Sequence, residues 1–507
     1  MASVAYGPYE PDKSRFNSNV LPYVNNVVPT DDGWGPLPAI IPTPAIYAYL
    51  TWDNSGDKIQ WENGDNILVG LDYSGWNGFV KLPAACTGFY AARKKNGTEV
   101  MFAGTATTLY MLNRATLTWE DVSSTTYASA CRWYFFKFGD KVYCGNGFNF
   151  EQKFNIESDT VFSDNAGAPI CKYGYVIGNF AFRFNIVSWT AEPTFESPAA
   201  IMCSALEDVE DNILQNYNWC DAQLIPTGDE IMGAVPVTGG AHIWLRNGVV
   251  PMVISMSEVT FTLGDVDQSR GTSAPYALSS FGQDRYIVYA DDGFWLYANG
   301  FRAIGQGRIN KTFLEACDLD LLEDTIAMTD PENAVIWLSY TNTDGERRMF
   351  GYQFNLDRFT QSDIAVSASF VARTFVYSES DPPIIVANQP RFTIIDEDGR
   401  LGYLVGEPMA ATLTTNELQF SEGRSIINRA QLNGDVAPGD FTIIAITRDV
   451  KGGTPRSRPA RVASARSGDV STRANGKTLQ AQLDIASGAT WSIVSGLDIP
   501  GRRAGRA

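Results

Sequence analysis

Few side chains in this sequence have the character that enzymes use for acid–base chemistry. The chain has one histidine, His242, which stands beside Trp244 in the alternating segment "GGAHIWLRNG". A Ser-His-Asp triad needs a histidine together with a strained nucleophile turn, and the sequence has no GxSxG. Zinc sites need clusters of histidine and cysteine, which are also missing. We therefore interpret His242 as a structural residue.

Carboxylates are the remaining candidates for chemistry, because glycosidases use two of them as acid and nucleophile. Acidic side chains gather at Asp31–Asp32, Asp291–Asp292, 318–324 and 396–398. Those at 291–292 and 396–398 fall in turn patterns, where aspartate satisfies local backbone, and the group at 318–324 fits a solvated helix face. The segment "DEDGR" holds only a fragment of a calcium loop. We assign no catalytic, cofactor-binding or metal-binding residue.

The cysteine pattern indicates a chain made in a reducing compartment. The count is odd and no CxxC pair occurs, which favours small buried side chains over a disulfide or metal framework. No charged and apolar leader opens the chain, and no apolar run approaches the roughly 18 residues that a membrane span needs. We expect a soluble protein without a membrane-spanning segment, synthesised in a cytoplasm. The cysteines are Cys86, Cys131, Cys144, Cys171, Cys203, Cys220 and Cys317.

Charge is distributed unevenly along the chain. The net charge is −18, yet the segment from Arg448 to Ala507 has eleven Lys/Arg against four Asp/Glu, which leaves a net −25 on residues 1–447. An acidic body argues against tight binding of nucleic acid. Only one aromatic residue, Trp491, follows residue 450, so the basic segment lacks the aromatic platforms of single-strand binders. We expect it to dock on an acidic partner through Arg456, Arg458, Arg461, Arg466, Arg473, Arg502, Arg503 and Arg506.

Short aromatic hairpins must position these groups. The segment "RYIVYADDGFWLYANGFRAIG" (285–305) places apolar runs on either side of Asp-Asp-Gly and Asn-Gly, which is the signal of tight turns between strands. Similar segments recur at roughly 35 to 55 residues, the spacing of four-stranded propeller blades. One or two sandwiches would also give short strands, but the pattern favours an all-β fold with a propeller of about six to eight blades.

Three parts of the chain differ in composition. Residues 1–45 are an extended, proline-rich arm that lies on its own core or on a neighbouring subunit. Residues 46–415 form the propeller-like body, with helical insertions near 196–217 and 309–326, the second with Asn310 as a possible N-cap. Residues 416–507 form a small C-terminal β element that carries the basic segment.

Three stretches resemble one known family. These are 9–40 with its "P-D…N-V-x-P…G-W-x-P" arm, 228–309 with Gly233, "GTSAP" and "DDGFWLYANG", and 468–507 with "RANG" and "WSIVSGLDIPGRR". They are similar to the tail hub or nozzle proteins of short-tailed phages, also called packaged-DNA stabilisation proteins or tail accessory factors. The resemblance implies a propeller in a ring of about six subunits below the head–tail connector. It further implies a lumen for double-stranded DNA, attached fibres or a needle, a place in the virion tail and no enzymatic activity.

Two functions stay open at this point. The first is a structural virion protein whose ring retains packaged DNA and forms the conduit for its ejection; an acidic body suits this role because it repels phosphate. The second is a propeller that binds or degrades polysaccharide, with paired carboxylates or with an aromatic pocket from Trp244, Trp295 and Trp337. Because these tryptophans stand inside alternating strands, core packing is the favoured interpretation.

Overall fold

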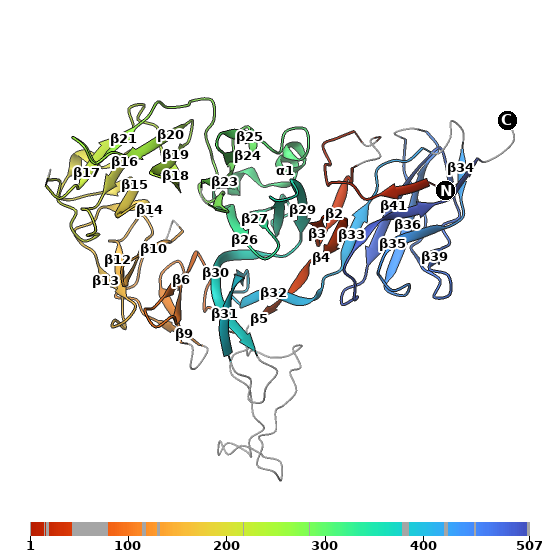
Figure 1. The fold of residues 1–507 in the computed structure, drawn as a ribbon, viewed down its shortest axis with the longest axis horizontal. Coiled ribbons are helices and arrows are strands. Elements are labelled where there is room, and N and C mark those ends of the chain that lie inside the picture. Colours follow the sequence, from red (N-terminus) through yellow and green to blue (C-terminus); the bar gives the residue numbers. More distant parts are fainter. Residues whose placement is uncertain are drawn as a thin grey trace, which may run out of the picture.

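The computed structural model describes residues 2–14, 16, 20–42, 80–113, 118–128, 132–215, 217–282, 284–377, 385–419, 424–450 and 453–503. These residues form almost entirely antiparallel β-structure in two lobes (Figure 1). One lobe is a propeller of seven four-stranded sheets, and the other is a β-sandwich. The predicted all-β propeller is confirmed, and seven blades fall within the expected range.

The first four blades follow one another along the chain, each with its strands in sequence order. Blade 1 consists of β6 (Gly88–Arg93), β7 (Glu99–Gly104), β8 (Leu109–Asn113) and β9 (Thr118–Asp121). Blade 2 consists of β10 (Tyr134–Phe138), β11 (Lys141–Gly145), β12 (Gln152–Asn155) and β13 (Ser163–Asp164). Blade 3 consists of β14 (Ile170–Ile177), β15 (Phe180–Ser188), β16 (Ser197–Cys203) and β17 (Asp221–Leu224). Blade 4 consists of β18 (Ile231–Val237), β19 (Gly240–Leu245), β20 (Val249–Ile254) and β21 (Phe261–Leu263).

The last three blades complete the circle. Blade 5 consists of β22 (Leu278–Ser280), β23 (Arg285–Ala290), β24 (Gly293–Ala298) and β25 (Phe301–Ala303). Blade 6 consists of β26 (Ile326–Asp330), β27 (Val335–Thr341), β28 (Arg347–Gln353) and β29 (Arg358–Ser362). Blade 7 consists of β30 (Val366–Tyr377), β31 (Ile385–Asp396), β32 (Leu401–Pro408) and, from the N-terminal arm, β5 (Pro38–Pro42).

The first strand of each blade faces the propeller axis. These innermost strands contact one another in the order β6, β10, β14, β18, β22, β26 and β30, and β30 contacts β6 again. The circle is therefore closed by blade 7 against blade 1. Backbone hydrogen bonds reinforce this joint, from Leu401 N to Val80 O (2.9 Å) and from Leu82 N to Gly399 O (2.9 Å).

Blade 5 shows why the aromatic segments fold into blades. Strands β23 and β24 pair from Arg285↔Ala298 to Ala290↔Gly293, with Asp291 and Asp292 in the turn between them. The next turn uses Asn299, whose φ of 58° lies in the left-handed region that asparagine tolerates. The alternating side chains then fill the spaces between neighbouring blades, so Tyr286 and Val288 are buried beside Trp244 of blade 4.

The sandwich draws strands from both ends of the chain. One sheet has the order β3-β4-β42-β35-β39 with β1 on β42, and the other has the order β2-β33-β41-β36-β37 with β38 on β36. A third, smaller sheet has the order β40-β34-β43. The N-terminal strands are β1 (Ala2–Ala5), β2 (Tyr23–Asn25), β3 (Val27–Thr30) and β4 (Gly33–Pro36). The C-terminal strands are β33 (Ala411–Thr414), β34 (Ser425–Ile427), β35 (Ala430–Gly434), β36 (Phe441–Arg448), β37 (Arg456–Ser457), β38 (Arg461–Val462), β39 (Asp469–Val470), β40 (Ala474–Gly476), β41 (Thr478–Ile485), β42 (Val494–Ile499) and β43 (Gly501–Arg503).

The described residues of the N-terminal arm pack on their own chain, where they join the two lobes. The prolines explain where its strands lie, because proline lacks the N–H that a central strand needs. Pro29 lies in β3, at the edge of its sheet, and Pro38 lies in β5, the outermost strand of blade 7. One continuous apolar cluster runs from this arm into blades 5 and 6 and into the sandwich. Its members include Tyr6, Tyr9, Trp34, Phe294, Phe313, Phe350, Leu413, Leu483 and Trp491.

Helices are short and few in the described part of the chain. The expected insertion near 309–326 contains α1 (Asn310–Ala316) and the 3-10 segment η2 (Leu319–Asp324) between blades 5 and 6; a second 3-10 segment, η1 (Pro193–Phe195), lies in blade 3. The helix expected within 196–217 is wrong, because Ser197–Cys203 pairs with β15 as strand β16. None of the helices described is long and apolar enough to cross a membrane.

Candidate docking surface and interior sites

The basic C-terminal segment places three arginines along one edge of the sandwich. Arg456 pairs opposite Thr447 of β36, Arg458 donates its backbone N–H to Ala445 O (2.9 Å), and Arg461 pairs opposite Ile443. These partners alternate along one strand, so the three arginines follow each other at about 7 Å, from ~3.3 Å per residue. All three are exposed. We call Arg456, Arg458 and Arg461 the basic edge.

Most of the basic edge lacks an ionic partner. Arg456 forms an ion pair with Asp449 (2.9 Å), whereas Arg458 and Arg461 form no ion pair with any carboxylate in the described ranges. Charged residues on an edge strand also prevent unwanted pairing with other sheets, which is the structural explanation for such a row. Two unpaired cations on an acidic protein additionally offer a complementary surface to a negative partner.

The other arginines of the predicted docking set lie away from the basic edge or outside the described residues. Arg466 is exposed in the turn that leads from β38 to β39, and Arg473, also exposed, precedes β40 with a φ of 43°. Arg502 and Arg503 belong to β43, whose backbone pairs with Ile426 and Ser425 of β34. Arg506 lies outside the described residues. The described members of the predicted set are therefore divided among the β36 edge, the turn between β38 and β39, and the three-stranded sheet.

His242 lies in an aromatic group between blades 4 and 5. Its Nδ1 is 3.2 Å from the hydroxyl of Tyr286, and its ring meets that of Tyr297 edge-on at 4.5 Å between centroids. Burial lowers the pKa of His242, and Asp284 opposes this shift. The neutral imidazole thus fills a largely aromatic space.

The carboxylates at 291–292 and two of those at 396–398 are occupied by local contacts. Asp291 accepts from Ser273 Oγ (2.9 Å) and Asp292 from Trp295 Nε1 (2.6 Å). At 396–398, Arg400 forms ion pairs with Asp396 (2.7 Å) and Asp398 (2.6 Å). Within the described ranges no three His, Cys, Asp or Glu side chains are arranged to hold a metal ion.

Burial also accounts for the cysteines and two of the tryptophans. The six cysteines in the described ranges are buried and unpaired, and Cys131 lies outside those ranges. Burial raises the pKa of the Cys86 thiol to about 11, which disfavours the reactive thiolate. Trp244 and Trp337 are fully buried, so they are unavailable for stacking on a sugar. Trp295 is half-buried, with the Arg270 guanidinium 3.9 Å from its ring centroid.

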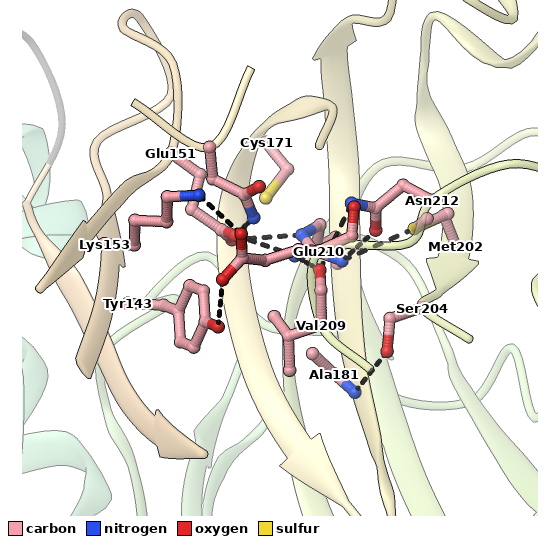
Figure 2. A network of polar contacts seen from close by, with 12 residues as sticks. Tyr143, Glu151, Lys153, Cys171, Ala181, Met202, Ser204, Val209, Glu210 and Asn212 are labelled. Atoms are coloured by element: carbon pink, nitrogen blue, oxygen red, sulfur yellow. Dashed lines mark hydrogen bonds and ion pairs between the residues drawn. The ribbon is translucent and has the colours of Figure 1, made fainter. Parts of the chain in front are cut away.

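A buried ion pair that we did not predict joins blades 2 and 3 (Figure 2). Arg183 on β15 contacts Glu151 in two places, Nη2 to Oε1 at 2.7 Å and Nε to Oε2 at 3.0 Å. Asn212 and the Val209 carbonyl accept from the same guanidinium, and Asn165 and Tyr134 donate to the carboxylate. One sequence signal pointed here, a lone arginine inside the apolar run "FAFRFNIV". The full set of partners marks a structural joint.

A second interior feature is the cavity at the centre of the propeller. It has a volume of about 380 Å³, and residues from all seven blades or from the segments just before their innermost strands line it. Arg132, which precedes β10, is the one charged residue in the described lining. The sequence gives no pattern that distinguishes this arginine.

Comparisons with known proteins bear on the fold only. No family model and no curated protein sequence matches the chain. Among solved structures, the chain is similar to BamB from Moraxella catarrhalis, at 12% identity and a TM-score of 0.35 over 75% of this chain and 92% of that one. It is similar to PorZ of the type-IX secretion system of Porphyromonas gingivalis, at 10% identity and a TM-score of 0.36, over 75% of this chain and 46% of that one. It is also similar to an exo-β-1,3-galactanase from Phanerochaete chrysosporium, at 11% identity and a TM-score of 0.23, over 79% of this chain and 99% of that one.

Proposed function

We propose that this protein is a structural, non-enzymatic component of the tail of a short-tailed phage. Copies assemble into a nozzle or hub ring of about six subunits below the head–tail connector. The ring retains packaged DNA and forms the conduit for its ejection, and fibres or a needle attach to it. The proposal combines the family resemblance of three sequence stretches with the charge distribution on the folded chain.

The observation that carries the proposal is the position of unpaired cations on an otherwise acidic molecule. Arg458 and Arg461 lie exposed on the edge of the sandwich, while residues 1–447 have a net charge of −25. A head-to-tail ring needs two different, complementary surfaces on each copy. A basic edge that meets an acidic propeller of the next copy, or an acidic connector, provides this complementarity and directs association.

The conduit in this proposal runs between copies. The cavity inside one propeller, about 380 Å³, has the size of a small-molecule pocket and leaves no room for duplex DNA. A lumen enclosed by several acidic propellers would repel phosphate and so let DNA slide.

The polysaccharide alternative lacks its expected chemistry in the described lining of the central cavity. A glycosidase places two carboxylates beside the bond that it cleaves. The described lining of the central cavity contains no carboxylate, and two of the three tryptophans considered for sugar stacking are fully buried.

Negative-stain electron microscopy of the purified protein tests the proposal. We expect rings with a central opening, and rings stacked on the connector when that partner is added. A monomer that stays monomeric with the connector present, and that releases reducing sugar from a polysaccharide, would favour the alternative.

A further inference from the structure

The central cavity of the propeller has the features of a ligand pocket. Its volume of about 380 Å³ lies within the range of about 300–1,000 Å³ that such pockets have. Because every blade contributes to its wall, the pocket exists in a single copy of the chain. The pocket therefore does not depend on the ring proposed above.

Arg132 brings an unneutralised positive charge to this pocket. Its Nη2 donates to the carbonyl of Ser367 (2.5 Å), and its Cζ lies 5.8 Å from the ring centroid of Tyr276. Neither of these contacts within the described residues is an ion pair. Its remaining N–H groups therefore have no acceptor in that part of the chain.

The surroundings make this cation unusual. Burial lowers the pKa of Arg132 and the like charge of Arg347 acts in the same direction, whereas Cys86, Tyr276 and Asp324 oppose the shift. Arg347 itself donates to Val366 O (3.3 Å), next to the carbonyl that Arg132 uses. Arg132 is half-buried, and a charge that is partly removed from water has a cost in desolvation unless a partner neutralises it. A cation at the wall of an open pocket is therefore suited to receive an anion from solution.

The remaining wall indicates what kind of anion fits. Most of its lining residues are apolar or aromatic, and its polar side chains other than Arg132 include the hydroxyls of Thr87, Ser280 and Ser369. The apolar part is Phe89, Trp133, Tyr175, Tyr276, Leu278, Ile326 and Met328. A guanidinium binds a carboxylate through two parallel hydrogen bonds, and the apolar wall suits an apolar body.

We propose that the centre of the propeller is a binding site for a small organic carboxylate with an aromatic or aliphatic body, held by Arg132. The carboxylate of the ligand accepts hydrogen bonds from the N–H groups of Arg132 that do not bond Ser367, and the apolar body of the ligand packs between Trp133 and Tyr276. The site is separate from the basic edge and from any DNA conduit.

Calorimetric titration of the full chain with benzoate tests this site. We expect saturable binding at millimolar concentrations and a higher melting temperature with benzoate present. Inorganic phosphate, which has charge without an apolar body, is the comparison probe and should bind more weakly. Arg132→Met should weaken benzoate binding by about tenfold or more, as loss of a charged hydrogen-bond partner does. Arg461→Met, which removes an exposed cation from the sandwich, should leave it unchanged.

Stability without ligand provides a second readout. Arg132 is half-buried and forms no ion pair within the described residues, and replacing such a partly desolvated charge by an apolar side chain of similar size is often neutral or stabilising. Arg132→Met should therefore melt at the same or a higher temperature than the wild type. No saturable benzoate binding, or equal binding by the wild type and Arg132→Met, would overturn the proposal, and so would a large loss of stability in Arg132→Met that assigns this residue to folding alone.

Discussion

The guanidinium of Arg183 and the carboxylate of Glu151 face each other across the joint between blades 2 and 3, with both side chains fully buried. The segment that follows β16 closes over them, since Asn212 and Val209 accept hydrogen bonds from Arg183. Two neighbouring blades and one long loop thus meet at a single pair of charges. Such a pair tolerates removal of both partners better than removal of one.

The first prediction concerns this pair. Arg183→Met leaves the Glu151 carboxylate buried without its cation, so we expect a loss of about 3–5 kcal/mol in the free energy of unfolding. The double variant Arg183→Met/Glu151→Met should recover much of that loss. Urea unfolding followed by tryptophan fluorescence measures both.

An exposed ion pair serves as the control for this prediction. Lys95→Met breaks the surface contact with Asp140 and should leave the free energy of unfolding close to that of the wild type. An Arg183→Met variant as stable as Lys95→Met would contradict the role of the buried pair.

The second prediction concerns a close contact beside blade 5. A Cβ on Gly293 would lie 1.8 Å from Asn310 Nδ2, and Gly293 has a φ of +117°. Asn310 is used here to bond the hairpin, since its Oδ1 accepts from Phe294 N (3.3 Å), rather than as the N-cap expected from the sequence. Gly293→Ala should therefore destabilise the protein by about 2–5 kcal/mol, from backbone strain plus overpacking.

Gly300 in the same blade separates the two causes. Its φ is +141°, but a Cβ there would meet nothing within 4 Å. Gly300→Ala should thus suffer only backbone strain, about 1–3 kcal/mol. Thermal unfolding of the two variants gives the difference, and equal melting temperatures would argue against the contact with Asn310.

The third prediction concerns pH. Because burial lowers the pKa of His242 below 6.5, the unfolded chain takes up a proton at this position before the folded protein does. The stability linked to His242 is therefore complete above that pH and is lost as the pH falls below it. Compared with His242→Phe, the wild type should lose more melting temperature between about pH 7.5 and about pH 5.5. Parallel curves for the two proteins would show that His242 does not titrate differently on folding.

The fourth prediction concerns the basic edge. Arg458→Glu/Arg461→Glu should reduce assembly of the ring, or its attachment to the connector, at low ionic strength. Wild-type assembly should weaken as salt is added, because exposed charges are screened. Sedimentation across a salt series measures both effects.

A single reversal elsewhere has the same net charge as either Arg458→Glu or Arg461→Glu alone and is the control for those single variants. Arg285→Glu changes an exposed arginine on β23 of blade 5 and should leave assembly unchanged. The free energy of unfolding of both proteins should lie within about 0.5 kcal/mol of the wild-type value, because surface substitutions usually have small effects. Normal assembly of Arg458→Glu/Arg461→Glu at low salt would remove the basic edge from the proposal.

The hairpins of the propeller were predictable because their information is local. Turn residues such as Asn299 and alternating side chains such as those of 285–298 specify pairs of strands within a few residues. The blade count follows less directly, since the connections differ in length. Residues 197–203 contain helix-favouring Ala and Met, yet they pair with β15 because tertiary contacts override propensity.

The sites depended on register and closure, which one sequence does not reveal. The row of Arg456, Arg458 and Arg461 was visible only as composition until their pairing with β36 placed them along one edge. Arg132 could be recognised as part of a pocket only from the folded chain, where residues of all seven blades, or of the segments just before them, line the same cavity. Arg183 differs, because a charged residue within an apolar strand pattern signals a buried partner in advance.

The first described strand, β1, pairs with β42, which follows it by almost 500 residues. Strand β5 of the same arm pairs with β32 and so completes blade 7. The arm is therefore made long before either of its partners. The sandwich needs a strand about 90 residues further along the chain than the propeller does, so we expect the sandwich to be completed after the propeller. A chain that ends between residues 408 and 494 therefore has all the strands of the propeller but a sandwich without its central strand β42, which exposes unpaired edges to aggregation and proteolysis.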